Sequence, residues 1–225
     1  MGMRLAALCS GGKDSSLALW LAQKQGHKIA HIVAMIPKRE DSWMFHFPNI
    51  QLIDLFAACT SLSLIKTETS GEREQELEDL KRALSELDIE GVVSGVIASN
   101  YQKSRIDRIC EELNLKSIAP LWGREPIELL REMLNARFDI LITSVAAQGF
   151  DESWLGRKID EGCLEDLKRL HAKFRINISA EGGEYESLVL DAPFFKKRIE
   201  VLETERIWRG TNGYLRIKHV KLVEK

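Results

Sequence analysis

Short apolar, β-branched runs alternate with amphipathic stretches through the first two-thirds of the chain. The apolar runs have the length of strands buried on both faces, and they cover residues 5–9, 29–36, 62–67, 91–97, 116–119 and 139–145. The stretches between them place apolar residues at helical spacing, as in Leu77, Leu80, Leu84 and Leu87. Alternation of buried strands with helices predicts a parallel sheet with right-handed crossovers, and therefore an α/β fold.

The pattern changes after about residue 148. A loop-like segment over residues 149–157 leads into a predicted helix over 162–174. Strands are then predicted near residues 185–190, 198–209 and 214–223. The tetrapeptide Gly-Thr-Asn-Gly at 210–213 is typical of a hairpin loop between the last two strands. We therefore expect two domains, a parallel-sheet domain over residues 1–148 and a smaller α+β domain over residues 149–225.

Composition limits the classes of partner. The 225 residues carry a formal net charge of −2, so no global positive charge recruits nucleic acid or an anionic membrane. The N-terminus shows no signal peptide, and no apolar stretch approaches the length of a membrane span. The four cysteines form no C-x-x-C pair and are interpreted as buried hydrophobes of a reducing compartment. We expect a cytoplasmic location, with no membrane, no direct nucleic-acid partner and no zinc site.

A glycine-containing hexapeptide follows the first predicted strand and opens the first predicted helix. Its residues are Ser10, Gly11, Gly12, Lys13, Asp14 and Ser15. The glycine pair lets the backbone turn sharply and approach a ligand, and the N–H groups of a helix start favour an anion. The serines add hydroxyl donors, the lysine a positive charge, and Asp14 a carboxylate suited to Mg²⁺. The hexapeptide matches neither the Walker loop nor the dinucleotide fingerprint. It predicts a nucleotide phosphate site, against the alternative of a turn that only caps the helix.

A second strand end opens into a helix at residues 95–105, Gly-Val-Ile-Ala-Ser-Asn-Tyr-Gln-Lys-Ser-Arg. Parallel strands end on one edge of their sheet, so Gly95 is expected near the hexapeptide. Arg105 falls in the first predicted turn, where a cation gains nothing from the helix dipole and a phosphate contact would explain it. The alternatives are a solvated Arg105 and a Tyr101 that packs instead of stacking on a substrate.

Two further loops are rich in functional side chains. Residues 43–49 follow the second predicted strand and are expected to form a lid or base-packing surface that includes His46, or else a satellite core. Residues 181–187, Glu-Gly-Gly-Glu-Tyr-Glu-Ser, offer carboxylates and a ring to a cationic group such as imidazolium or ammonium. An acidic surface turn is the alternative. The residues of this segment expected on the substrate side are Glu181, Gly183, Glu184, Tyr185 and Glu186.

The hexapeptide alone resembles the pyrophosphate loop of the N-type ATP pyrophosphatases, the PP-loop superfamily. Together with Pro-Leu-Trp-Gly-Arg at 120–124 and Trp-Leu-Gly-Arg at 154–157, the motifs resemble the diphthine–ammonia ligase family over nearly the full length. The short form is similar to the archaeal type. The resemblance implies a Rossmann-like, adenine nucleotide alpha hydrolase-like PP-loop domain with a five-stranded parallel sheet. The C-terminal α+β domain would then bind the substrate.

The same resemblance implies an ATP-dependent amide ligase. Such an enzyme adenylates the carboxylate of diphthine, a modified histidine on translation elongation factor 2, and amidates it with ammonium to give diphthamide, AMP and pyrophosphate. ATP and Mg²⁺ are the implied cofactors, with Lys13, Asp14 and Arg105 catalytic and Asp14 on the Mg²⁺. His46 and Tyr101 would join the acidic segment on the substrate side. A homodimer is compatible with the resemblance.

Two other functions stay open on the sequence. One is a tRNA-modifying enzyme of the same fold, against which the near-neutral charge and the missing cysteine machinery count. The other is a non-catalytic sensor that binds ATP or AMP, in which the acidic segment would have no explanation.

Overall fold

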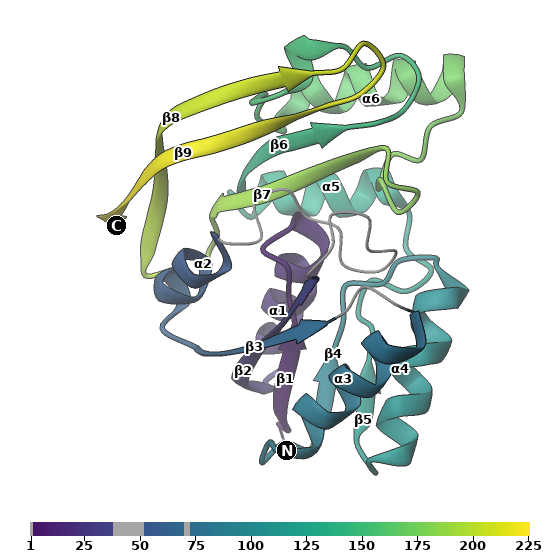
Figure 1. Cartoon of the computed structure of the whole chain (residues 1–225), viewed down its shortest axis with the longest axis vertical. Coiled ribbons are helices and arrows are strands. Elements are labelled where there is room, and N and C mark those ends of the chain that lie inside the picture. Colours follow the sequence, from purple (N-terminus) through teal and green to yellow (C-terminus); the bar gives the residue numbers. More distant parts are fainter. Residues whose placement is uncertain (1, 38–51, 70–72) are drawn as a thin grey trace.

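The computed structural model describes residues 2–37, 52–69 and 73–225 (Figure 1). Five parallel strands form the first sheet, in the order β3-β2-β1-β4-β5. Their bounds are Arg4–Leu8 for β1, Lys28–Pro37 for β2, Ser63–Thr69 for β3, Gly91–Val93 for β4 and Lys116–Ile118 for β5. The five-stranded parallel sheet is thereby confirmed. Its strand order reverses between β1 and β4, the kind of position where α/β sheets bind ligands.

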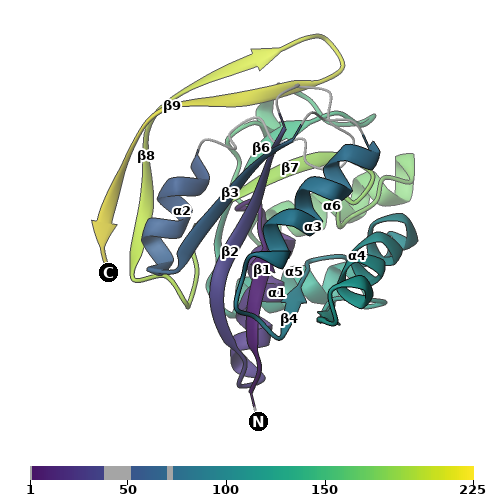
Figure 2. The ribbon, with the colours of Figure 1, turned by 60° about the horizontal axis from the view of Figure 1, so that its bottom comes forward.

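Helices cover both faces of this sheet (Figure 2). They are α1 Lys13–Lys24, α2 Ile53–Thr60, α3 Arg73–Ser85, α4 Asn100–Glu112 and α5 Pro126–Asn135. Successive side chains of a strand point to opposite faces of the sheet, so a strand can contribute residues to the apolar cluster on each face. Ala6 and Val33 pack into the cluster with α3 and α4, whereas Leu5, Ala7 and Ile32 pack into the cluster with α1 and α5. This two-sided burial is the physical origin of the near-continuous apolar runs.

A second, antiparallel sheet has the strand order β7-β6-β9-β8. Its elements are β6 Asp139–Val145, β7 Tyr185–Asp191, β8 Lys197–Trp208 and β9 Gly213–Glu224, with η2 Glu152–Trp154 and α6 Glu161–Phe174. The prediction that residues 139–145 join the parallel sheet was wrong. An apolar run shows that a strand is buried, but it carries no signal for the sheet in which the strand pairs. The predicted boundary at residue 148 therefore lies after the first strand of the second sheet.

The two sheets share one hydrophobic core. Ile140 and Val145 of β6 and Leu188 of β7 belong to the same buried cluster as Leu5 and Leu17 of the first sheet and α1. The shared core fixes the second sheet against the ends of the first, which is what creates a site between them. No helix within residues 2–37, 52–69 and 73–225 is long and apolar enough to cross a membrane.

The β8–β9 hairpin extends away from the rest of the second sheet (Figures 1 and 2). β8 and β9 pair along their whole length, but β9 pairs with β6 at two positions, Ser144–Tyr214 and Val145–Gly213. The hairpin loop predicted at 210–213 is confirmed, since the N–H of Arg209 donates to the carbonyl of Asn212 at 2.8 Å. The sheet thus holds the hairpin at its turn end.

Candidate active site

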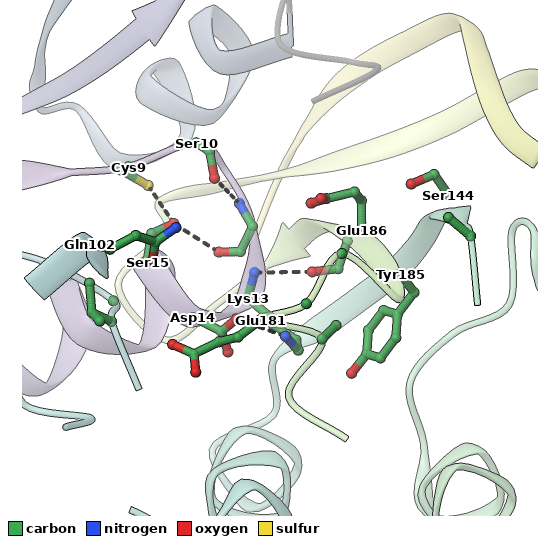
Figure 3. A pocket seen from close by; sticks show the side chains of 18 of the residues that line it. Cys9, Ser10, Lys13, Asp14, Ser15, Gln102, Ser144, Glu181, Tyr185 and Glu186 are labelled. Carbon is green, nitrogen blue, oxygen red and sulfur yellow. Dashed lines mark hydrogen bonds and ion pairs between the residues drawn. The ribbon is translucent and has the colours of Figure 1, made fainter. Parts of the chain in front are cut away.

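A cavity of about 660 Å³ lies where the carboxyl ends of β1, β2 and β4 meet the second sheet. Its lining residues fall within 8–15, 94–106, 144–146, 180–187 and 209–214, and Val33 and Met35 of β2 and Leu80 of α3 complete it. The volume falls within the ~300–1,000 Å³ usual for small-molecule sites. Figure 3 shows Lys13 and Asp14 at the start of α1, with Glu181, Tyr185 and Glu186 contributed by the C-terminal half of the chain. The structure therefore brings together two of the predicted motifs, residues 10–15 and residues 181–187.

The loop between β1 and α1 turns at Gly11, whose φ of +85° lies in the left-handed region that favours glycine. The second sheet holds this turn in place. The carbonyl of Gly11 accepts the N–H of Val189 at 2.9 Å, and the N–H of Lys13 donates to Oγ of Ser187 at 3.2 Å. α1 begins directly after Gly12. The phosphate-site geometry expected from the sequence, a strand end turning into a helix start, is present.

The serine hydroxyls lie along the same loop (Figure 3). Oγ of Ser15 donates to the carbonyl of Gly12 at 3.1 Å and lies 3.4 Å from Sγ of Cys9. Oγ of Ser10 accepts the N–H of Gly12 at 3.4 Å. Both predicted serines therefore line the cavity at its loop side, where their hydroxyls can turn toward an anion.

Lys13 holds a buried positive charge in the floor of the site. Nζ donates to Oδ2 of Asp14 at 2.7 Å and to the carbonyl of Ser179 at 2.6 Å, and lies 5.1 Å from the ring centroid of Tyr185. Burial alone would lower the pKa of Lys13, but Asp14, Tyr185 and Glu186 raise it above its usual value. The ammonium therefore stays protonated at neutral pH.

The side chain of Asp14 is 26% exposed, and Asp14 lines the cavity beside Lys13. Among residues 2–37, 52–69 and 73–225 there is no group of three or more His, Cys, Asp and Glu residues that could hold a metal ion. A single carboxylate fits Mg²⁺ that is held chiefly by nucleotide phosphates and water, because Mg²⁺ commonly takes one or two protein carboxylates.

Gly95 lies where the β4–α4 loop meets the start of α1. A Cβ atom there would come within 2.6 Å of the backbone N of Ser15 and 2.7 Å of the carbonyl carbon of Asp14. Only glycine lets these two backbones approach so closely. The structure thus places Gly95 at the cavity, as predicted, and gives it a packing role; contact with a nucleotide stays a prediction.

The carboxylate of Glu181 meets the other end of this loop. Its oxygens accept the N–H groups of Ile97 at 2.7 Å, of Ala98 at 3.0 and 2.8 Å, and of Ser99 at 3.4 Å. Ser99 itself caps α4 by accepting the N–H of Gln102 at 3.3 Å. Glu181 therefore occupies an anion position at the start of a helix, and its predicted contact with a substrate stays a prediction.

Glu184 and Tyr185 order the acidic segment from within. Glu184 accepts the N–H groups of Asn177 at 2.8 Å and Gly182 at 3.0 Å. The buried hydroxyl of Tyr185 donates to the carbonyl of Ile178 at 2.9 Å. Gly183 turns with φ of +81°. These contacts favour a shaping role for both side chains, beside the substrate contact predicted for them.

Glu186 lines the cavity, as Glu181 does, but it lies next to the charges of Lys13 and Asp14 at the start of α1. Burial raises its pKa to about 7; Lys13 opposes this and Asp14 adds to it. A carboxyl group with such a pKa exchanges its proton near neutral pH, which suits a group that binds or deprotonates a cation.

The structure places Arg105 in the second turn of α4, and its guanidinium stacks 3.5 Å from the ring centroid of Tyr101. Nη1 of Arg105 donates to the carbonyl of Tyr101 at 3.3 Å. Neither residue is among the described residues that line the cavity. The residues of α4 that do line it are Gln102 and Ile106. Their predicted roles stay predictions, and His46 lies outside the described residues.

The sequence did not indicate the part of the cavity lining that comes from β6 and from the turn of the β8–β9 hairpin. Arg209 and Tyr214 at the hairpin turn and Ser144 at the end of β6 all line it. The sequence does show an arginine and a tyrosine flanking the hairpin loop, but only the pairing of β6 with β9 brings them to the site.

Two family models match the chain. A model described as "Diphthamide synthase N-terminal domain" matches residues 3–117, and one described as "Diphthamide synthase C-terminal domain" matches residues 125–223. The two matches divide the chain before β6, where the chain passes from the first sheet to the second.

Curated relatives that match the chain carry the name diphthine–ammonia ligase, and three of them show the extent of the match. The Mus musculus protein is 34% identical over 252 residues, which cover 99% of this chain and 94% of that protein. The Homo sapiens protein is 32% identical over 246 residues, with 99% and 91% covered. The Schizosaccharomyces pombe protein is 32% identical over 238 residues, which cover 96% of this chain but 39% of that longer protein. A chain of this length therefore matches mammalian relatives almost end to end.

Proposed function

The chain belongs to the diphthamide synthase family, and from this membership and the geometry of the cavity we propose that it is an ATP-dependent ligase that amidates diphthine. The half that holds the parallel sheet binds the nucleotide. The C-terminal half receives the protein substrate, a translation elongation factor 2 that bears diphthine. The relatives favour neither a tRNA-modifying enzyme nor a sensor.

The proposed reaction has two steps. A carboxylate oxygen of diphthine attacks the α-phosphorus of ATP, and pyrophosphate leaves with the electrons of the broken P–O bond. Ammonia then attacks the carbonyl carbon, AMP leaves, and the nitrogen loses a proton to give the amide. Because AMP is a far better leaving group than oxide, the protein needs chiefly to position and neutralise the reacting charges.

The residues of the hexapeptide position and neutralise the charges of the phosphates. Gly12, Ser10 and Ser15 line the cavity at the start of α1, where the helix dipole favours phosphate. Lys13, which stays cationic, lies beside them. Mg²⁺ bound with the nucleotide would be held by Asp14, and it would shield the charge of the departing pyrophosphate.

Glu186 is the group best placed to act on the nitrogen donor. Among the described residues, the carboxyl group of Glu186 accepts no hydrogen bond, whereas Glu181 and Glu184 accept backbone N–H groups. Its pKa of about 7 lets it hold ammonium as a carboxylate and accept a proton as ammonia is released. Arg105, Tyr101 and His46 keep their proposed places at the phosphates and at the substrate. A cytoplasmic location and a homodimer also stay predictions.

The observation that carries the proposal is the cavity shared by the hexapeptide and the acidic segment in a chain that matches both family models. The test is incubation of the protein with radiolabelled ATP, Mg²⁺, ammonium and elongation factor 2 bearing diphthine, with AMP resolved from ADP. We expect AMP only when the modified factor and ammonium are both present. ATP binding without AMP formation would contradict the proposal and favour a sensor, and retention of tRNA with AMP formation would favour a tRNA-modifying enzyme.

A further inference from the structure

The turn of the β8–β9 hairpin forms a wall of the cavity opposite the sheet that carries the hexapeptide. Arg209 and Tyr214 line this wall. The turn is held in place because Tyr214 pairs with Ser144 of β6, and Gly213 pairs with Val145. A Cβ atom on Gly213 would lie 2.6 Å from the carbonyl oxygen of Ile207, so the turn is also closely packed. Arg209 is thus carried to the cavity by a fixed element.

Arg209 brings a positive charge that the fold itself does not neutralise. Its guanidinium lies 5.6 Å from the ring centroid of Tyr214, and in the described part of the chain no carboxylate forms an ion pair with it. The other cation on the cavity wall, Lys13, is already paired with Asp14 at 2.7 Å. Arg209 is therefore the cation of the described cavity wall that is not already paired with a carboxylate of the described residues.

Two anions meet in the proposed reaction, the nucleotide phosphates and the carboxylate of the protein substrate. The phosphates are served from the first sheet, by the loop before α1 and by Lys13. Arg209 comes from the second sheet and is solvent-exposed, so a side chain carried by another protein can reach it from outside. The planar fork of a guanidinium also matches a carboxylate by two parallel hydrogen bonds.

We propose that Arg209 binds the carboxylate of the protein-borne diphthine and positions it for attack on the α-phosphorus. This inference rests on the proposed function, and it adds a residue for substrate recognition that lies outside the sequence motifs. Recognition of a carboxylate by Arg209 has a specific consequence. The product carries a neutral amide in place of the carboxylate, so the enzyme should prefer the substrate form of the factor over the product form.

Arg216 provides a matched control on the same hairpin. It approaches the same ring, with Nη2 3.2 Å from the hydroxyl of Tyr214 and the guanidinium 6.0 Å from the ring centroid. It pairs with Glu205 at 3.3 Å and is not among the cavity-lining residues that the structure describes. A change at Arg216 therefore perturbs the hairpin and Tyr214 without removing a charge from the cavity.

The test measures the affinity of the protein for elongation factor 2 in its diphthine and diphthamide forms, by calorimetry in the absence of ATP. We expect the wild type and Arg216→Ala to bind the diphthine form ~10-fold or more tightly than the diphthamide form, since a charge-assisted pair contributes that much. Arg209→Ala should bind both forms alike, and Arg209→Lys should keep part of the preference. Equal preference in Arg209→Ala and the wild type, or no preference in the wild type, would overturn the inference.

A second measurement separates the carboxylate from the nucleotide as the anion bound. In AMP-forming assays, Arg209→Ala should raise KM for the modified factor ~10-fold or more and leave KM for ATP within about twofold of wild type. A rise in KM for ATP alone would assign Arg209 to the phosphates and overturn the inference. Because the calorimetric preference does not need turnover, a wild type that forms no AMP but discriminates the two forms would refute the ligase and leave Arg209 as the carboxylate-binding residue.

Discussion

Glu181 accepts the backbone N–H of Ala98 with both of its carboxylate oxygens, at 3.0 and 2.8 Å, although 83 residues separate the two in the chain. The bond joins the acidic segment before β7 to the loop between β4 and α4. Both segments line the cavity. A negative charge at this place also meets the favourable end of the α4 dipole. These hydrogen bonds therefore hold the acidic segment and the β4–α4 loop together at the cavity.

Glu181→Gln should lower the free energy of unfolding by ~1–3 kcal/mol, because hydrogen bonds to a charged acceptor are replaced by one neutral acceptor and an NH₂ group that faces N–H donors. Urea denaturation at pH 7 measures the loss. Glu111→Gln is the control, since Glu111 is exposed on α4 and should change the stability by less than about 0.5 kcal/mol. Equal urea midpoints for the two variants would show that the hydrogen bonds of Glu181 contribute nothing.

Gly95→Ala tests the close approach of the β4–α4 loop to α1. The added methyl group would lie 2.6 Å from the backbone N of Ser15, so one backbone must shift. We expect a loss of ~1–3 kcal/mol in stability and weaker ATP binding in a fluorescence titration. Gly162→Ala is the matched control, because its nearest neighbour, Oδ1 of Asp160, would lie 3.4 Å away at the start of α6. Equal stability of Gly95→Ala and Gly162→Ala would contradict the packing argument, and unchanged ATP affinity would separate this packing from nucleotide binding.

Lys13→Ala should reduce AMP formation by ~10²–10³-fold, since it removes a fixed charge from the phosphate side of the cavity. The assay is AMP release at saturating ATP, with thermal unfolding as a check that the variant folds. Lys24→Ala, at the exposed end of the same helix, should retain wild-type activity. Activity of Lys13→Ala within about threefold of wild type would remove this residue from the proposed machinery.

The pKa of about 7 at Glu186 predicts a pH-dependent cost to the unliganded fold. Below the unfolded-state pKa of 4.5 the group is protonated in both states and costs nothing. As pH rises toward 7, the unfolded state loses the proton first, so stability falls, and the cost is complete above pH 7. Glu186→Gln should therefore stabilise the protein by up to about 3 kcal/mol at pH 8 and leave it unchanged near pH 4.5. Urea denaturation at the two pH values measures this, and a gain that is equal at both would contradict the raised pKa.

The elements that depend on local sequence could be predicted. The turn at residues 10–15 follows from a buried strand, a glycine pair and an amphipathic helix in immediate succession, and the structure has α1 starting at Lys13. The hairpin at 210–213 follows from its turn residues in the same way. Each of these signals lies within one short stretch of chain, so a single sequence is enough to predict the element.

The arrangement that depends on distant contacts could not be predicted. Residues 139–145 have the burial pattern of a parallel strand, but they pair with β7 and β9, whose residues lie forty or more positions further along the chain. The acidic segment is expected to face a substrate, and that expectation stays a prediction; the backbone N–H groups that Glu181 and Glu184 accept are distant contacts that the sequence did not indicate. Arg209 reaches the cavity only through the pairing of β6 with β9. The residue type indicates which chemistry a side chain can perform, but the tertiary structure decides which group that side chain contacts.

The most direct test of the central claim follows the nitrogen atom. The protein is incubated with ATP, Mg²⁺, nitrogen-15-labelled ammonium and elongation factor 2 bearing diphthine, and the modified peptide of the factor is analysed by mass spectrometry. We expect the labelled nitrogen to enter the diphthine side chain as an amide, in amounts equal to the AMP formed. AMP formation without labelled nitrogen in that side chain, or no change in the peptide at all, would contradict it.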